Sequence, residues 1–161
     1  MNEIPYPYLP EDKEILYVPE NNIFIRAAKE IRDNDSTDLM NPTGAVIVKN
    51  ETIIYRAANK AKLENPTLLK IHSKYCIRRI LRIPSGKGYF LCPGCADHKQ
   101  HAEFRAVSLA IKEGLNINGA DLYLYGHWWC CESCWDQMIN HGIQNVYLLE
   151  NAHNIFIRKK S

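Results

Sequence analysis

Two short motifs in this chain carry side chains that bind zinc well. The segment HAE at 101–103 begins one amphipathic stretch, and the segment CESC at 131–134 begins another. One imidazole and two thiolates make three ligands, the number that a catalytic zinc uses while its fourth position stays open. A carboxylate two residues from the imidazole can move protons at such a centre. The pattern therefore predicts a catalytic zinc site, with His101, Cys131 and Cys134 as ligands and Glu103 as the proton shuttle.

The elements around these motifs must bring them together. Apolar residues at helical spacing predict a helix that begins at His101 and ends at Gly114. A strand at 121–126, a helix from Cys131 to about His141 and a strand at 144–150 should follow, which implies a right-handed parallel crossover. Each motif then stands at a helix N-terminus, whose positive potential lowers the pKa of a thiol.

The first half of the chain predicts a helix, a hairpin and a second helix. A helix should begin at Asn21 or Asn22 and end near Asp33, before a β-hairpin with strands at 45–48 and 52–59. Residues 66–81 have the pattern of one helix, which Pro84 ends. Apolar residues at 155–157 indicate a fifth strand. Because too few residues precede it for a parallel crossover, we expect this last strand to be antiparallel, the alternative being a frayed tail.

Composition and charge indicate an ordinary globular protein. We expect an extended arm rich in Pro and Tyr at 1–20, which lies on the domain or on a partner subunit, the alternative being a partly disordered tail. One domain should follow at 21–161, with an insertion at about 65–100. The net charge of +2 gives no reason to expect binding to nucleic acid, although the pI of about 8.2 does not exclude it. No apolar run is long enough for a membrane span, and the first residues lack a secretory signal. We therefore expect a cytoplasmic protein with reduced cysteines.

Three segments of the chain resemble the zinc-dependent cytidine/deoxycytidylate deaminase family. NPTGAVIVKN is similar to the first strand of that family, HAEFRAVSLAIKEG to its zinc-ligand helix, and CESCWDQMINHGIQNVYL to its second zinc helix and the strand that follows. The resemblance implies a three-layer α/β fold, in which a mixed sheet has helices on both faces. It also implies zinc-assisted attack of water on C4 of cytosine, with Glu103 as the group that transfers protons, and a homo-oligomer.

Four residues are candidate substrate contacts. The resemblance implies a contact from Asn59, at the end of the second strand, although Asn59 is also an ordinary residue for a turn. Ala102, next to the ligand His101, and Trp129, which can stack on a base, are further candidates. Arg105 can pair with a phosphate or can be a solvated helix residue. A basic face is formed by Lys70, Lys74, Arg78, Arg79 and Arg82. It is interpreted as solvated, the alternative being a face that binds a nucleotide or nucleic acid.

The insertion carries cysteines of its own. Cys92 and Cys95 form a C-x-x-C turn that, together with Cys76 and a histidine, predicts a second, structural zinc site. His98 is our first choice for the fourth ligand and His72 the alternative; reduced cysteines that only close a loop are the other interpretation. Cys130 competes with Cys131 for the catalytic zinc, but we expect it to pack as a small apolar group.

These features predict a zinc-dependent hydrolase that deaminates a cytosine mononucleotide similar to dCMP. The alternatives are deamination of another nucleobase substrate, namely a nucleoside triphosphate, a free base or single-stranded nucleic acid, and a zinc-stabilised binding subunit without activity. Glu103 argues against the last alternative, since a purely structural zinc site needs no carboxylate beside it.

Overall fold

A mixed five-stranded sheet forms the centre of the molecule, with strand order β1-β5-β4-β2-β3. The computed structural model describes residues 3–84 and 86–157. Strands β2 and β3 form the predicted hairpin, and β2 also pairs antiparallel with β4. Strands β4 and β5 are parallel, as the predicted crossover requires, and β1 runs parallel to β5 at the edge of the sheet. The strands are β1 (Ile15–Val18), β2 (Gly44–Lys49), β3 (Thr52–Ala58), β4 (Asp121–Tyr125) and β5 (Asn145–Leu149).

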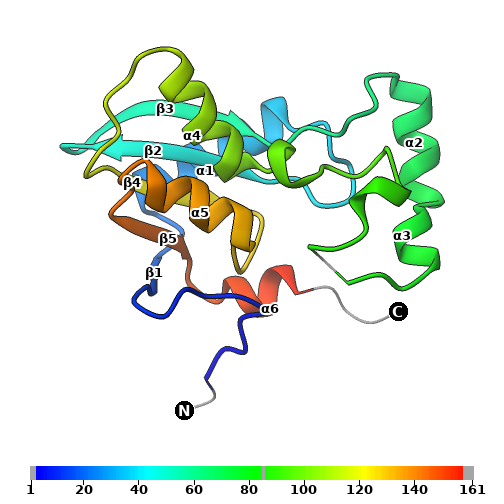
Figure 1. Ribbon diagram of the computed structural model, residues 1–161, viewed down its shortest axis with the longest axis horizontal. Coiled ribbons are helices and arrows are strands. Elements are labelled where there is room, and N and C mark those ends of the chain that lie inside the picture. Colours follow the sequence, from blue (N-terminus) through cyan, green and yellow to red (C-terminus); the bar gives the residue numbers. More distant parts are fainter. Residues whose placement is uncertain (1–2, 85, 158–161) are drawn as a thin grey trace.

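Helices cover both faces of this sheet, so the predicted α/β fold is confirmed (Figure 1). Helix α1 (Ile23–Asp35) lies on one face and contacts β2, β3 and β4. Helices α4 (Ala102–Lys112) and α5 (Glu132–Asn140) lie side by side on the other face. The side chains between the layers include Ile25, Ile47, Leu122, Leu124 and Leu148, each almost completely buried. This core fixes α4 and α5 relative to each other and to the sheet.

The N-terminal arm supplies a strand that the sequence analysis did not predict. Ile15 faces the core, and the four residues of β1 pair in register with residues 146–149 of β5. Earlier in the arm, Tyr6 stacks on Trp128 and hydrogen-bonds through its hydroxyl to that of Tyr17. The arm thus lies on its own domain, which is one of the two positions that we predicted for it.

The predicted C-terminal strand is wrong. After β5 the chain turns at Asn151, which has a left-handed conformation (φ 60°), and Ala152–Phe156 forms the short helix α6. An antiparallel fifth strand would have to pair with a free edge of β5, but β1 and β4 occupy both edges. Phe156 instead packs edge-on against Tyr125. Ile157 follows this helix, and the remainder of the chain lies outside the described residues.

The insertion forms a lobe beside the main body (Figure 1). The sequence predicted a single helix over 66–81, whereas the structure has α2 (Pro66–Lys74) and α3 (Ile77–Ile80), separated at Tyr75 and Cys76. Both of these residues leave helical geometry, with ψ angles of 55° and 118°. Short 3-10 helices at Tyr89–Leu91 and His98–Gln100 complete the lobe and lead to α4. No helix in the described part of the chain is long and apolar enough to cross a membrane.

Candidate active site and metal clusters

The N-termini of α4 and α5 meet at the predicted catalytic site. His101 is the N-cap residue of α4 and Cys131 that of α5, and both have the extended backbone that a cap requires. Neither side chain makes a capping hydrogen bond to a backbone N–H group of its own helix. The imidazole and the thiol point toward each other instead, because core packing holds the two helices side by side.

Three donor atoms converge at this junction. The sulfur atoms of Cys131 and Cys134 are 3.2 Å apart, and the His101 Nδ1 atom is 3.5 Å from each of them. A tetrahedral zinc with bonds of about 2.3 Å to sulfur and about 2.0–2.1 Å to nitrogen separates its ligand atoms by about 3.5–3.8 Å. The spacing in the structure is close to this range. The residues present therefore fit a zinc ion with one position left for a further ligand.

The ionisation of the three groups also suits a metal. The hydrogen bond with Cys134 lowers the pKa of the Cys131 thiol to about 2 although burial opposes this, and the bond to His101 and its charge lower it further. Burial raises the pKa of Cys134 well above its ordinary value. Burial would lower the pKa of His101, but the bond to Cys131 and the charge of Glu103 raise it overall. A zinc ion that bound these groups would displace their protons.

Glu103 lies in the first turn of α4 and is only 5% exposed. Its carboxylate belongs to a group with the His101 ring and the Cys134 sulfur in which all donor atoms lie within 4.8 Å of one another. Burial raises the pKa of this carboxyl, against the opposing charge of His101. A carboxyl group whose pKa is raised binds a proton more readily than an ordinary carboxylate, which suits a general acid or base.

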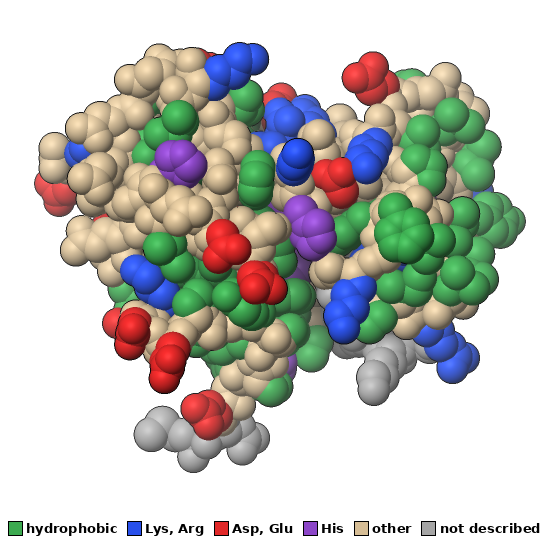
Figure 2. Space-filling model, viewed as in Figure 1, with side chains coloured by type: hydrophobic (Ala, Val, Ile, Leu, Met, Phe, Trp, Pro, Cys, Tyr) green, Lys and Arg blue, Asp and Glu red, His purple; other side chains and the backbone are tan. Residues whose placement is uncertain are grey.

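A pocket opens beside these residues. Figure 2 shows a hollow between the insertion lobe and the main body, along which charged and histidine side chains gather. Five segments line the pocket: the loop after α1, the end of β3, the insertion, the start of α4 and the loop before α5. The lining residues from the metal centre are His101, Glu103 and Cys131. Because the insertion supplies one wall, the pocket is surrounded rather than a shallow groove.

Of the predicted substrate contacts, some line the pocket and others do not. Trp129 lines the pocket together with His127, whereas Trp128 packs against Tyr6 and His153 outside it. Ala102 is completely buried and does not line the pocket. Arg105 does not line it either: its guanidinium donates to the carbonyl of Ala58 and to the side chain of Gln100. In this arrangement Arg105 holds the end of β3 to the segment before α4.

Asn59 lines the pocket, but its amide is fully used within the protein. Its oxygen accepts from the Thr43 N–H at 2.9 Å and from the Ser36 hydroxyl at 2.5 Å. Its nitrogen donates to the Asn41 carbonyl at 2.8 Å and to the Asp38 carboxylate at 3.5 Å. These four bonds use both N–H donors and both lone pairs of the amide. Asn59 therefore shapes the pocket by holding the loop at 36–43.

Cys130 is completely buried in the hydrophobic core. It belongs to no potential metal-binding group among the described residues, and burial raises the pKa of its thiol well above the ordinary value. These observations agree with the apolar packing that we predicted for it.

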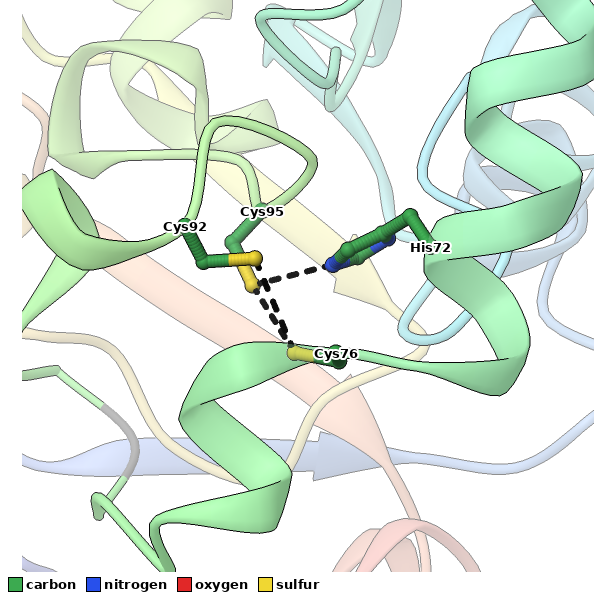
Figure 3. A group of neighbouring side chains, drawn as sticks. All are labelled: His72, Cys76, Cys92 and Cys95. Atoms are coloured by element: carbon green, nitrogen blue, oxygen red, sulfur yellow. Dashed lines mark hydrogen bonds between the residues drawn. The ribbon is translucent and has the colours of Figure 1, made fainter.

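The second cluster lies within the insertion (Figure 3). Cys76 Sγ is 3.9 Å from Cys92 Sγ and 3.6 Å from Cys95 Sγ, and Cys95 Sγ is 3.5 Å from His72 Nε2. All four residues are buried and their donor atoms lie within 4.8 Å of one another. The break between α2 and α3 turns Cys76 toward the other three. Three sulfurs and one nitrogen at these separations fit a closed, structural zinc site.

His98 was the wrong choice for this cluster, and His72 takes the place. The ring of His98 lies instead beside the first cluster, with Nδ1 3.8 Å from Cys131 Sγ, and contacts Tyr89 edge-on. Gly94 makes room for the His72 side chain, because a Cβ atom at Gly94 would lie 2.3 Å from the imidazole ring. The absence of a side chain in the C-x-x-C turn thus lets the His72 ring approach closely.

The pocket residues that sequence reasoning missed include Asp38, Arg78 and Tyr89. Asp38 is 6% exposed, and its carboxylate accepts from the backbone N–H groups of Met40 and Asn41. Arg78 was interpreted as part of a solvated basic face, but it is only 3% exposed. The sequence signal for the burial of Arg78 was its position two residues after Cys76, because a metal ligand also fixes the positions of its neighbours in sequence.

Comparison with known proteins agrees with this geometry. The model of the cytidine and deoxycytidylate deaminase zinc-binding region matches residues 19–150. A search of curated protein sequences gave no match. Similar solved structures include a dCMP deaminase from cyanophage S-TIM5 in complex with dCMP and dUMP, at 16% identity and a TM-score of 0.47, over 82% of this chain and 84% of that chain.

Two further structures have different stated activities. A guanine deaminase from Bacillus subtilis has 18% identity and a TM-score of 0.44, over 82% of this chain and 66% of that one. A diaminohydroxyphosphoribosylaminopyrimidine deaminase/5-amino-6-(5-phosphoribosylamino)uracil reductase from Thermotoga maritima has 22% identity and a TM-score of 0.46, over 78% of this chain. The present chain spans only 28% of that protein. The family model covers most of the sequence, including both motifs, and the chain therefore belongs to the family of zinc-dependent cytidine and deoxycytidylate deaminases.

Proposed function

We propose that this protein deaminates a cytosine mononucleotide hydrolytically, with dCMP as the representative substrate, and releases the uracil nucleotide and ammonia. One observation carries the proposal: the buried carboxylate of Glu103 lines the same pocket as His101 and Cys131. When bound at this centre, zinc supplies the Lewis acidity that activates water for attack near neutral pH. His101, Cys131 and Cys134 are the residues that would hold it.

Glu103 provides the proton transfers of the reaction. Its carboxylate accepts one proton from the attacking water and delivers it to the ring nitrogen N3. It then accepts the second proton, from the hydroxyl newly formed on C4, and delivers it to the amino group, which departs as ammonia. Each transfer needs a group that is stable in both protonation states, which a carboxyl group with a raised pKa provides. Its place in the first turn of α4, two residues from the His101 ligand, keeps its distance from the reacting carbon constant through these transfers.

The surroundings of the pocket support a small substrate. Trp129 and His127 supply aromatic rings in the wall near Cys131, where a base can pack. The insertion and the loop held by Asn59 form the other walls. A single nucleotide fits a pocket with walls on several sides better than a continuous single strand, which requires an open groove along the backbone. Family membership favours cytosine as the base.

The proposal is tested by ammonia release from dCMP, CMP, dCTP, deoxycytidine, cytosine, adenine and guanine. We expect dCMP to be the best of these substrates. Glu103→Gln keeps the size and polarity of the side chain but removes its ionisation, and we expect it to lower kcat by about 10²- to 10⁴-fold, the usual contribution of general acid–base catalysis. Zinc per chain should stay unchanged. Full activity in Glu103→Gln, or deamination of guanine or adenine in place of cytosine compounds, contradicts the proposal.

Two further expectations remain predictions. Self-association into a homo-oligomer is checked by light scattering on the purified chain, and a cytoplasmic location by fractionation of the cells that make it. Neither the mechanism nor the pocket described above depends on their outcome.

A further inference from the structure

Arg78 is a buried cation in the wall of the pocket. It lies on α3 within the insertion, is only 3% exposed, and lines the same pocket as Glu103 of α4. Arginine is rarely buried so completely, because removing a charge from water is costly unless other groups compensate. Its surroundings should therefore show what the charge is there to bind.

Contacts within the insertion fix the guanidinium without neutralising it. Its Nε atom donates to the Lys87 carbonyl at 2.9 Å and its Nη2 atom to the Pro84 carbonyl at 3.1 Å. The ring of Tyr89 packs against its face, with 4.1 Å between the guanidinium carbon and the ring centroid. Carbonyls and an aromatic ring orient a cation but carry no opposing charge. Among residues 3–84 and 86–157, no carboxylate lies within ion-pair distance of Arg78.

The second cluster supplies part of the compensation. Cys95 lines the same pocket as Arg78, and as a metal ligand its sulfur would carry negative charge near the guanidinium. The two carbonyl bonds account for two of the five N–H donors of a guanidinium. The other donors are available to a ligand in the pocket. A planar group with paired N–H donors is suited to a phosphate, which it can bind through two oxygens.

We propose that Arg78 is the specificity-determining residue of this pocket and that it recognises the phosphate group of the mononucleotide. The inference rests on the proposed function, because Glu103 must hold the cytosine ring. Glu103 belongs to the main body and Arg78 to the insertion, so a bound nucleotide bridges the two, with its base at α4 and its phosphate at α3. A nucleoside or free base would leave the buried charge of Arg78 without an anion.

The second cluster gives Arg78 its position. Cys76 is the N-cap residue of α3 and lies two positions before Arg78, and its sulfur is 3.6 Å from that of Cys95 (Figure 3 shows the two cysteines). Cys95 and Ala96 themselves line the pocket. A metal that joins His72, Cys76, Cys92 and Cys95 therefore fixes the wall from which Arg78 reaches the substrate.

The experiment compares one substrate with phosphate and one without it. We expect Arg78→Gln to lower kcat/KM for dCMP by about 10- to 100-fold, the usual effect of removing a charge-assisted hydrogen-bonded pair, mainly through KM. The value for deoxycytidine should change by less than about threefold, since that substrate has no phosphate to bind. Arg79→Gln is the matched control, because Arg79 is the adjacent residue of α3 but is exposed and outside the pocket. It should leave both values unchanged.

A binding measurement separates this inference from the proposed function. Inorganic phosphate, titrated by calorimetry, should bind the unmodified chain and Arg79→Gln equally, and Arg78→Gln at least about tenfold more weakly. Arg78→Lys, which keeps the charge but not the paired donors, should lie between the two. Equal losses for dCMP and deoxycytidine, unaltered phosphate binding, or loss of zinc from Arg78→Gln would overturn the assignment. Failure of the unmodified chain to deaminate either compound contradicts the proposed function, whereas the phosphate titration still decides whether Arg78 binds an anion.

Discussion

The cluster at His101 takes its side chains from the N-termini of two helices on the main body, whereas the cluster at His72 lies wholly within the insertion. The first has three nitrogen and sulfur donors beside a pocket that Glu103 also lines. The second has four such donors, all buried. Zinc sites with three protein ligands and an open position perform chemistry, while sites with four protein ligands stabilise structure.

Packing achieves these two arrangements by different means. The first cluster forms because the core holds α4 and α5 against the sheet, so most of its precision comes from the hydrophobic layer beneath it. Around the second cluster, the buried apolar group consists of the three cysteines Cys76, Cys92 and Cys95, against which Met40 and Tyr89 pack. A small lobe with so little apolar core depends on cross-links for its structure. The second metal should therefore matter for the stability of the lobe, and the first for catalysis.

The largest difference between the two clusters is expected for Cys131→Ser, which removes a donor from the first cluster only. We expect deamination to fall by at least about 10³-fold, because the Lewis acid is lost or misplaced. Zinc should fall by one equivalent per chain, and the unfolding temperature should change little because the core beneath α5 remains intact. Atomic absorption, activity and calorimetry on the same sample check this. Loss of both zinc equivalents would show that the two clusters do not form independently.

Cys92→Ser makes the converse change. The Cys92 sulfur accepts hydrogen bonds from the backbone N–H groups of Gly94 and Ile77, which hold the pKa of this thiol below its ordinary value although burial opposes its ionisation. We expect the loss of one zinc equivalent and faster amide hydrogen exchange in residues 66–100, with the sheet still protected. Activity should fall by only about 10- to 100-fold, the effect of displacing a positioning group by about 1 Å. Unchanged exchange in the lobe would contradict a structural role for this cluster.

Local patterns explain why the first cluster was predictable from the sequence. His101 and Cys131 each stand where an apolar helical pattern begins, so spacing along the chain already placed them at helix N-termini. The parallel β4–β5 pair then followed from the succession of strand, helix and strand. The α1 helix, with its Asn22 cap, and the β2–β3 hairpin were predictable for the same reason, because each depends on residues close in sequence.

The errors all concern contacts between distant segments. Strands β1 and β5 pair although most of the chain separates them in sequence. Because β1 occupies the outer edge of β5, a strand after Asn151 cannot pair there. No Gly or Pro marks the break at Tyr75–Cys76 in the sequence. The break accompanies the packing of Cys76 against Cys92 and Cys95, which are distant in sequence. Arg78 seemed to belong to a solvated face because its bonds to the carbonyls of Pro84 and Lys87 are invisible in the helical pattern.

The smallest expected effect belongs to His98, the residue that lies between the two clusters in sequence but contacts only the first. His98→Ala removes one contact of 3.8 Å to the Cys131 sulfur and an edge-on contact with Tyr89. We expect both zinc equivalents to remain and kcat/KM to fall by about two- to threefold, the size of a weak, partly exposed hydrogen bond. His72→Ala is the comparison, and it should lose the zinc of the insertion because it removes one of four buried donors. Loss of that zinc from His98→Ala instead would return His98 to the second cluster, and loss of the other would make His98 a fourth protein ligand of the first. Either result would remove the distinction between an open and a closed site, which depends on His98 remaining outside both sets of ligands.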